Sequence, residues 1–393
     1  MTATPPPAQP SRAPAAHGPG GRPRARGLGV PFDGAYGALN AITDVAGVEV
    51  GYRTLIEGEG GAGSVVGAGP VRTGVTALFP RGRAAPLERV WAGVSSFNGD
   101  GEMTGAHWIR EGGCFVGPVL ITNTHGVGMA HHAAVKWLTR RPDYRAETDL
   151  WLLPVVAETS DARLNDMNGL HVGEADVVAA LEAAAGGAIA EGNVGGGTGM
   201  CCYDFKGGTG TASRRVELGG RSYHVGALVQ ANFGRRPALM VRGVPVGRLM
   251  PLTGTPQAGP AAREQGSIIV VVATDAPLLP VQLQRVARRA GLAMARTGTA
   301  GGSGSGDIFL AFSTAGEVAA RGLDPLPSLS YIPVGQVDPV FEATVAAVEE
   351  AILNALIAAE TMTGWNGHRA EALDHGLLQE ILRAHGRLDE AAI

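Results

Sequence analysis

The stretch GSIIVVVATDAPLLP, residues 266–280, carries the strongest structural signal in the chain. Its apolar run from Ser267 to Ala273 predicts a buried strand, because an unbroken series of apolar, mostly β-branched side chains is typical of a strand covered on both faces. The segment before it, GVPVGRLMPLTGTPQAGPAAREQG (243–266), is rich in glycine and proline and predicts a surface loop. A loop that ends at Gly266-Ser267 and runs straight into a core strand is an unusual junction, although an ordinary loop entering a strand remains the alternative.

Strand and helix patterns interleave on both sides of this junction. Further buried strands are predicted at Arg89–Ser95, Pro118–Asn123, Leu150–Val156, Ser222–Val229 and Asp307–Ser313. Helices are predicted at Gly128–Leu138, Glu174–Ala185, Pro280–Ala293 and Pro339–Ala359. This interleaving predicts an α/β or layered α+β architecture.

The composition excludes several classes of function. Among 393 residues the formal net charge is only -4, which disfavours an electrostatic binder of nucleic acid or membranes. The three cysteines, Cys114, Cys201 and Cys202, make a poor disulfide framework and have no zinc spacing. We therefore expect a cytoplasmic protein with no metal and no cofactor.

The N-terminal segment differs from the rest of the chain. Residues 1–26 consist mainly of Pro, Ala, Gly and Arg with almost no large apolar side chain, which predicts a disordered extension. Residues 27–393 are predicted to form a single domain.

Cleavage between Gly266 and Ser267 would create a serine with both a hydroxyl and a free α-amine. An α-amine titrates near pH 8 and can act as the general base for the hydroxyl of its own residue. Glycine before the serine permits the backbone geometry that an N-to-O acyl shift requires, because it has no Cβ to clash. Gly-Ser pairs are common, so this pair alone is weak support.

Two other stretches carry groups that suit such a nucleophile. The loop TGTAGGSGSGDIFLAFS (297–313) brings Ser305 and Asp307 to the start of a strand, where they could hold the α-amine. A nucleotide-binding turn is disfavoured there because the glycines lead into a strand and not into a helix. In VQANFG (229–234), Asn232 could donate to an oxyanion, although Asn before an aromatic and a glycine is more often a turn residue.

The stretch LWLLPVVAETSDARLND, residues 150–166, could supply substrate contacts. Glu158 follows a buried run and could present a carboxylate to a substrate ammonium. Trp151 could form a wall of the pocket. A solvated carboxylate is the simpler interpretation of Glu158 from spacing alone.

Taken together, eight stretches in order along the chain resemble the DmpA-like L-aminopeptidase/D-esterase family, which includes the β-peptidyl aminopeptidases. They are NAITDVAGVEVGY, FNGDGEMTG, GPVLITNTHGVG, LPVVAETSDARLNDMNG, GGTGMCCYDFKGGTGTASR, LVQANFGRR, GSIIVVVATDAPLLP and GSGSGDIFLAFSTA, from about Asn40 to Ala315.

The resemblance implies an α+β fold, a four-layer αββα sandwich, and self-cleavage at Gly266-Ser267 into chains 27–266 (with the N-terminal extension) and 267–393. Ser267 would then be the nucleophile. The other roles implied are oxyanion stabilisation by Asn232, support of the new N-terminus by Ser305 and Asp307, ammonium binding by Glu158 and an aromatic contact from Trp151.

Two positions depart from the family pattern. Asp307 stands where relatives often have Glu, so the resemblance does not fix how far its shorter side chain reaches. Ser160 stands where a tyrosine is expected, so the resemblance does not fix the shape of the pocket or the substrate preference. The resemblance further implies small peptide, amide or ester substrates and a tetramer of processed units. The alternatives are an acyltransferase of the ornithine acetyltransferase type, which uses a threonine nucleophile, and an uncleaved small-molecule binder.

Overall fold

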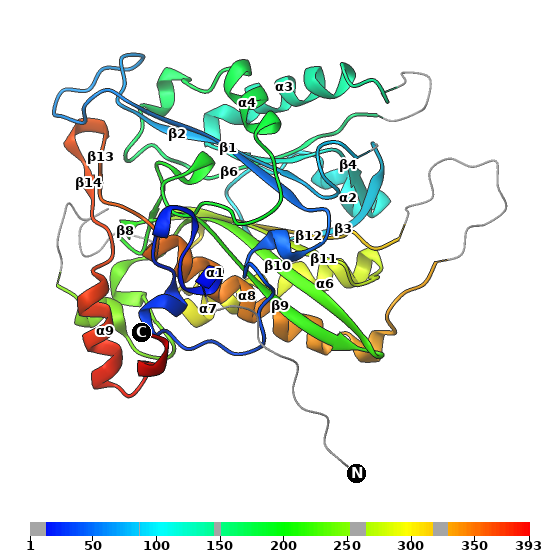
Figure 1. Ribbon diagram of the computed structural model, residues 1–393. Helices are drawn as coiled ribbons and strands as arrows, with labels where there is room; N and C mark the ends of the chain where they lie inside the picture. The colour runs from blue at the N-terminus through cyan, green and yellow to red at the C-terminus, as the bar shows by residue number, and fades with distance from the viewer. Residues whose placement is uncertain (1–12, 86, 145–150, 252–264, 317–328) are drawn as a thin grey trace, which may run out of the picture.

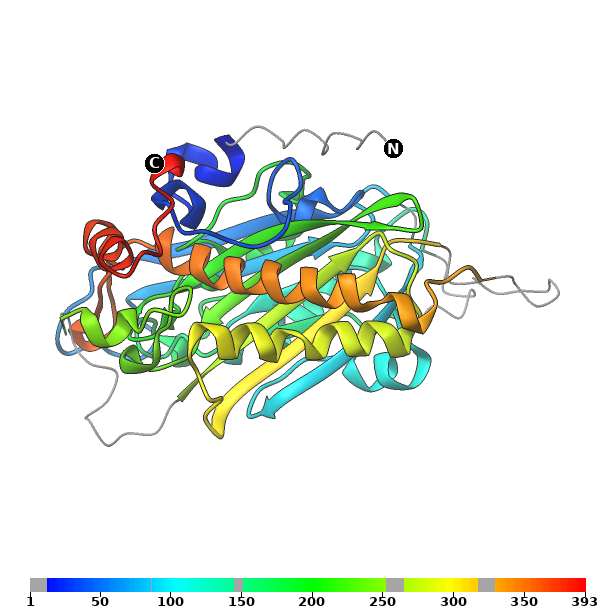
Figure 2. The ribbon, with the colours of Figure 1, turned by 90° about the horizontal axis from the view of Figure 1, so that it is seen from below.

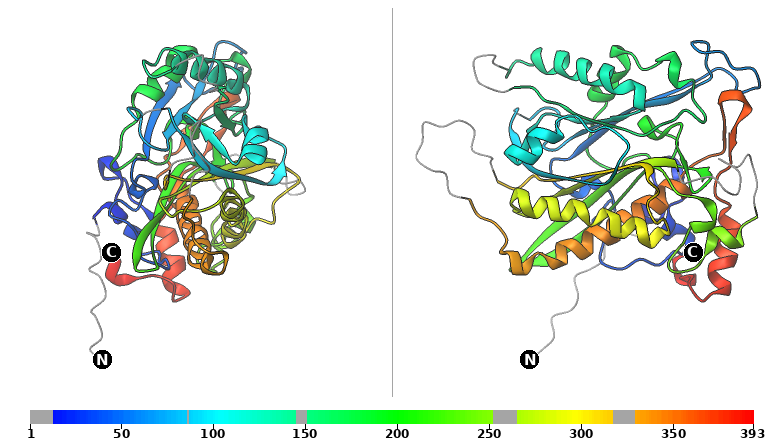
Figure 3. Two further views of the ribbon diagram at one scale, coloured as in Figure 1. Left: turned by 90° about the vertical axis from the view of Figure 1, so that its right-hand side faces the viewer. Right: turned by 180° about the vertical axis from the view of Figure 1, so that it is seen from behind.

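Two β-sheets stacked face to face form the centre of the molecule, and helices cover both outer faces (Figure 1). The computed structural model describes residues 13–85, 87–144, 151–251, 265–316 and 329–393. The order of layers, helices, sheet, sheet, helices, is also seen from behind (Figure 3). The predicted four-layer αββα sandwich is therefore confirmed.

The larger sheet has six strands in the order β4 (Cys114–Val116), β3 (Arg89–Gly99), β12 (Gly304–Ser313), β11 (Gln265–Thr274), β10 (Arg221–Asn232) and β9 (Gly208–Leu218). Strands β11 and β12 are parallel, and the other neighbours are antiparallel. The smaller sheet has the order β1 (Glu49–Glu57), β2 (Val71–Phe79), β5 (Val119–Thr122) and β6 (Val155–Glu158), with β5 and β6 parallel. Two short hairpins pair β7 (Cys201–Cys202) with β8 (Phe205–Lys206) and β13 (Met362–Thr363) with β14 (Arg369–Ala370).

Helices α3 (Val127–Thr139) and α4 (Glu174–Glu182) cover the smaller sheet. The larger sheet is covered by α6 (Pro280–Arg288), α7 (Ala290–Thr297) and the long α8 (Asp338–Ile357). In Figure 2, α6 and α7 follow one another in a line, and α8 runs beside them. The remaining helices are α1 (Ala13–Ala16), α2 (Ala106–Gly112), α5 (Val246–Leu249) and α9 (His375–Ala384).

The central strand β11 shows why this sequence forms a sandwich. Ile268, Val270 and Val272 pack into the core shared with α6, α7 and α8. Ile269 and Val271, on the opposite face, pack into the core between the two sheets. Because side chains alternate along a strand, an unbroken apolar run fills both cores at once.

The predicted helices are all present, with one interruption: the helix predicted over Pro280–Ala293 is divided at Arg289 into α6 and α7. The strand predicted at Leu150–Val156 is shifted, because β6 spans Val155–Glu158 and residue 150 lies outside the described residues. Among the described residues no helix has the length and apolarity needed to cross a membrane.

The prediction of disorder over residues 1–26 is wrong for residues 13–26, and residues 1–12 lie outside the described part. Arg24 is only 2% exposed, and its Nε donates to the buried Glu191 carboxylate at 2.7 Å. Arg26 donates from two nitrogens to Glu350, 2.8 Å each. The segment has few large apolar side chains, but Arg24 and Arg26 pair with buried carboxylates and attach it to the core. Composition alone does not reveal such pairing.

The carboxylate that Arg26 contacts is tightly held. Burial alone would favour the neutral acid, but the guanidinium groups of Arg214 and Arg26 lower the pKa of Glu350 to about 2. The residues predicted to be disordered therefore contribute to an ion-pair network inside the domain.

Candidate active site at the facing ends of the two sheets

Strand pairing in the larger sheet brings the predicted catalytic residues together. Ser267 lies opposite Asn232 on β10 and opposite Gly306 on β12. Gly306 stands between Ser305 and Asp307, so both flank the level of Ser267 on the neighbouring strand. All four side chains are buried, with Ser267 only 3% exposed. Three stretches far apart in sequence thus meet at one end of one sheet.

The Ser305 and Asp307 side chains act as a pair. Ser305 Oγ donates to Asp307 Oδ1 at 2.6 Å. Asn98 Nδ2, on β3, donates to Asp307 Oδ2 at 2.9 Å and to the Gly302 carbonyl at 3.1 Å. An irregularity in the pairing of β12 with β3 occurs at Asp307/Ile308. The carboxylate is thus fixed in position and points one oxygen at the serine next to the reaction centre.

Asn98 is a site residue that the sequence reasoning missed. It occurs in the glycine-rich stretch FNGDGEMTG, for which the sequence analysis assigns no site residue. Its contact with Asp307 depends on the register between β3 and β12, in which the two residues face each other. Only the family pattern of that stretch could have marked it.

The Asn232 amide has a fixed orientation. The backbone N–H of Cys201 donates to Asn232 Oδ1 at 2.8 Å, and Asn232 Nδ2 donates to the Ser160 carbonyl at 2.9 Å. An asparagine amide has two N–H donors, so the second is available to a group in the pocket that Asn232 lines together with Ser267. A donor held in place before a reaction is what oxyanion stabilisation requires.

A buried lysine supports the loop behind this amide. Lys206 Nζ donates to the Met200 carbonyl at 2.9 Å and to the Gly207 carbonyl at 3.0 Å. Burial lowers the pKa of Lys206 to about 8. Because Cys201 follows Met200, the lysine holds the stretch of backbone whose N–H orients Asn232.

Gly266 occupies a position that only glycine fits. Its φ of +149° lies in a region that other residues rarely adopt, and an added Cβ would lie 2.2 Å from the Asn232 carbonyl oxygen. The loop predicted over residues 243–266 needs correction here, since β11 begins at Gln265 and the Gly266–Ser267 bond lies inside the strand. Residues 252–264 are outside the described part, and α5 occupies Val246–Leu249.

Ser267 opens onto a pocket of about 670 Å³, a size suited to small-molecule ligands. Both sheets contribute to its lining. The residues are Asp100, Gly101, Glu102, Thr124, Glu158, Ser160, Ala162, Arg163, Met167, Asn232, Gly266, Ser267, Gly304 and His368.

Glu158 forms the centre of an acidic wall in this pocket. It is 3% exposed, and its Oε1 accepts the Glu102 backbone N–H at 3.0 Å, while Thr124 Oγ1 donates to Oε2. Burial raises the pKa of Glu158, against these hydrogen bonds, and the charges of Glu102 and Asp100 add to the increase. Three carboxylates thus line one pocket, an arrangement that attracts a cation.

Two predicted features of the pocket need comment. Trp151 is 81% exposed and is not among the described lining residues, so the structure does not bring it to the site. Ser160 does line the pocket, but its carbonyl accepts a hydrogen bond from Asn232, and its hydroxyl lies 3.7 Å from Met167 Sδ. In the described residues no three His, Cys, Asp or Glu side chains gather as a metal site would require.

The chain is similar to known proteins in sequence and in fold. The model of peptidase family S58 matches residues 40–370. The chain is 52% identical over 379 residues to the beta-peptidyl aminopeptidase BapA of Sphingosinicella microcystinivorans, covering 94% of each chain. It is 47% identical over 371 residues to the protein of that name from Sphingosinicella xenopeptidilytica, covering 92% of this chain and 91% of the relative.

A solved structure has the same fold. The L-aminopeptidase D-Ala-esterase/amidase of Ochrobactrum anthropi, described as a prototype of the serine aminopeptidases and a variant of the Ntn hydrolase fold, superposes with a TM-score of 0.86. It is 53% identical in sequence, and the match covers 93% of this chain and 100% of that one.

Proposed function

The chain belongs to peptidase family S58 and is an aminopeptidase, and we propose that it activates itself by cleaving the Gly266–Ser267 bond. Ser267 then becomes the N-terminal nucleophile of the second chain. The observation that carries the proposal is the strand register, which places Asn232 on one side of Ser267 and the Ser305–Asp307 pair on the other.

Self-cleavage would begin with Ser267 Oγ attacking the carbonyl carbon of Gly266. The peptide nitrogen leaves as the new α-amine, and the acyl group moves to Oγ as an ester. Water then hydrolyses the ester, releasing Gly266 as a carboxylate and restoring the Ser267 hydroxyl. The left-handed conformation of Gly266 and its close approach to the Asn232 carbonyl favour this role, since no side chain blocks the approach.

Turnover would use the same atoms. The α-amine of Ser267 accepts the hydroxyl proton while Oγ attacks the substrate carbonyl, and the second N–H of Asn232 donates to the oxyanion. The resulting ammonium donates its proton to the leaving amine or alcohol. Asp307, through Ser305, stabilises the amine while it is charged. Water attacks the acyl-enzyme in the reverse sequence of proton transfers.

The acidic wall selects the substrate. A free amino group is an ammonium at neutral pH, and Glu158 lies buried in the pocket with Asp100 and Glu102 nearby. We propose that Glu158 binds this ammonium, which restricts hydrolysis to amides, esters and short peptides with a free N-terminus. Assembly of the processed units into a homo-oligomer, a tetramer in the family pattern, belongs to the same proposal.

Hydrolysis of β-alanine and L-alanine p-nitroanilides, each beside its N-acetylated form, tests the proposal. We expect release of nitroaniline from the free-amine substrates only, because acetylation removes the charge that Glu158 binds. Ser267→Ala should abolish turnover and leave a single chain. Normal hydrolysis by Ser267→Ala would refute the nucleophile assignment, and equal hydrolysis of the acetylated substrates would refute the ammonium site.

A further inference from the structure

We infer that the pocket contains a second, cationic subsite, formed by Arg163 and His368, which binds the free carboxylate of a short peptide substrate. This inference rests on the proposed aminopeptidase function and names the substrate class more narrowly. The enzyme would favour zwitterionic di- and tripeptides over peptides whose C-terminus is blocked.

The lining of the pocket contains both acidic and basic side chains. Asp100, Glu102 and Glu158 are its acidic residues, and Arg163 and His368 are the side chains among the described lining that can carry positive charge. Ser267 lines the same pocket. A ligand that carries both a positive and a negative charge matches this lining better than a simple cation does.

Arg163 and His368 come from two segments of the chain that contact each other. Arg163 lies in the chain after β6, and His368 lies between β13 and β14. His368 Nδ1 is 3.2 Å from the Arg163 carbonyl oxygen, so Nδ1 carries the hydrogen and donates it. The backbone N–H of Trp365 donates to the Leu164 carbonyl at 2.9 Å. Two hydrogen bonds thus join the hairpin to the Arg163 segment.

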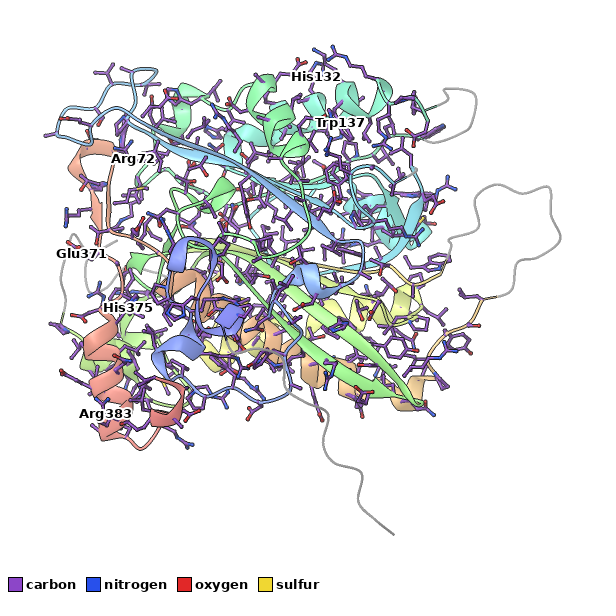
Figure 4. All side chains as sticks on the ribbon, in the orientation of Figure 1. Arg72, His132, Trp137, Glu371, His375 and Arg383 are labelled. Atoms are coloured by element: carbon purple, nitrogen blue, oxygen red, sulfur yellow. The ribbon has the colours of Figure 1, made fainter. Side chains whose placement is uncertain are left out.

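The hairpin is also tied to the smaller sheet. Arg72 on β2, labelled in Figure 4, donates from Nε to the Thr363 carbonyl at 3.0 Å and from Nη2 to the Gly58 carbonyl at 2.8 Å. Arg72 is buried. Thr363 is the last residue of β13, so this arginine fixes the strand end next to the turn that carries His368. The backbone segments that carry Arg163 and His368 are therefore held by the fold.

Arg163 is close in sequence to a residue that contacts the proposed oxyanion donor. Asn232, the proposed oxyanion donor, contacts the Ser160 carbonyl, three residues before Arg163. A short peptide whose ammonium is at Glu158 and whose scissile carbonyl is at Ser267 would keep its C-terminal part in the same pocket, which Arg163 also lines. The guanidinium group of arginine matches the geometry of a carboxylate and can donate two hydrogen bonds to the peptide's C-terminal carboxylate.

The test compares β-alanyl-L-alanine with β-alanyl-L-alanine amide, which differ only in the terminal carboxylate. We expect the wild-type enzyme to favour the free acid in kcat/KM. In Arg163→Met the ratio of the two kcat/KM values should fall about tenfold or more, mainly through the KM of the free acid. Arg163→Lys should restore part of the ratio. Arg110→Met is the matched control, because Arg110 is exposed on α2 outside this pocket, and it should keep the wild-type ratio.

The outcomes separate this inference from the function on which it rests. If Arg163→Met slows both peptides equally, Arg163 is structural and the subsite is refuted. An unchanged ratio, or a wild-type enzyme that cleaves the anilides but does not favour the free acid, also refutes it. A wild-type enzyme that cleaves neither the peptides nor the anilides would refute the proposed function itself.

Discussion

The two sheets that meet at the pocket contribute different kinds of group. At the end of the larger sheet, Asn232 and Ser267 face each other across paired strands, and their positions follow from register. At the end of the smaller sheet, Glu158 is the last residue of β6, and the chain beyond it carries Ser160 and Arg163 into the pocket. The proposed reacting groups therefore lie on paired strands, whereas the groups proposed to recognise charge lie at a strand end and on the chain that follows.

Substitutions in the two sheets are therefore expected to change different quantities. Changes at the end of the larger sheet should lower the rate of bond cleavage, because they alter groups that interact with the transition state. Changes at the end of the smaller sheet should act mainly on substrate affinity or on stability. The four predictions below test that division, in order of decreasing effect.

The largest effect is expected for Gly266→Ala. A Cβ at this position would lie 2.2 Å from the Asn232 carbonyl oxygen, and φ of +149° is strained for alanine. We expect the variant to remain a single chain for days and to lack activity. Gly128→Ala in α3 is the control, because an added Cβ there meets nothing within 4 Å. Mass spectrometry measures the processing of both variants. Rapid cleavage of Gly266→Ala would contradict the assigned geometry.

Asn232→Ala should reduce kcat by about 10²–10³-fold, as expected for the loss of one oxyanion donor. The KM should change much less, since the amide donates to charge that develops only in the transition state. Steady-state kinetics on β-alanine p-nitroanilide measure both values. If kcat were unchanged, Asn232 would serve only to position the Ser160 and Cys201 backbone.

On the other sheet, Glu158→Gln should raise KM about 10- to 100-fold while changing kcat less, because it removes the charge that pairs with the substrate ammonium. The shape of the side chain is kept, so the Glu102 N–H and Thr124 contacts can partly persist. Glu111→Gln, an exposed carboxylate outside this pocket, is the control. A fall in kcat with constant KM would mean that Glu158 acts on the rate of bond cleavage and not on substrate affinity.

The smallest effect concerns stability. Burial raises the pKa of Asp161 from 3.8 to about 6, despite hydrogen bonds that include one from Asn165 Nδ2 at 3.0 Å. A carboxyl whose pKa is higher in the folded state contributes stability that is complete below about pH 4 and is lost as pH rises through about 6. Asp161→Asn cannot titrate, so wild type should lose on the order of 2–3 kcal/mol relative to it across that range.

Thermal unfolding in a Ser267→Ala background, which keeps a single chain, measures this difference. We expect the Tm of the Asp161→Asn variant to rise relative to its parent between pH 4 and pH 7. An equal difference at both pH values would mean that Asp161 keeps one protonation state throughout.

Much of the fold and the grouping of the candidate catalytic residues could be predicted from the sequence. The apolar run of β11 predicted its own burial, and the order of the eight stretches predicted the sandwich that the structure contains. Ser267, Asn232, Ser305 and Asp307 were proposed from three separate stretches, and strand pairing brings them together. Each of these residues stands near the end of a clear strand, but Gly266-Ser267 and Asn232 are weak signals alone, and it is the resemblance of the eight stretches that implies their roles.

Residues whose role depends on distant partners could not be predicted. Asn98 reaches Asp307 only through the pairing of β3 with β12, and Lys206 is buried because three backbone carbonyls accept its hydrogens. Arg24 was placed in a disordered extension because its partner, Glu191, is 167 residues away. Trp151 was expected in the pocket, yet it follows residues 145–150, outside the described part, and is exposed.

Ser267 is proposed to become a chain terminus and thereby a catalyst. Intact mass and N-terminal sequencing of the purified protein under denaturing conditions measure whether the chain is cut before this residue. We predict two chains, the smaller running from Ser267 to Ile393, with aminopeptidase activity appearing in proportion to cleavage. A single uncut chain that hydrolyses free-amine substrates at full rate would contradict the account.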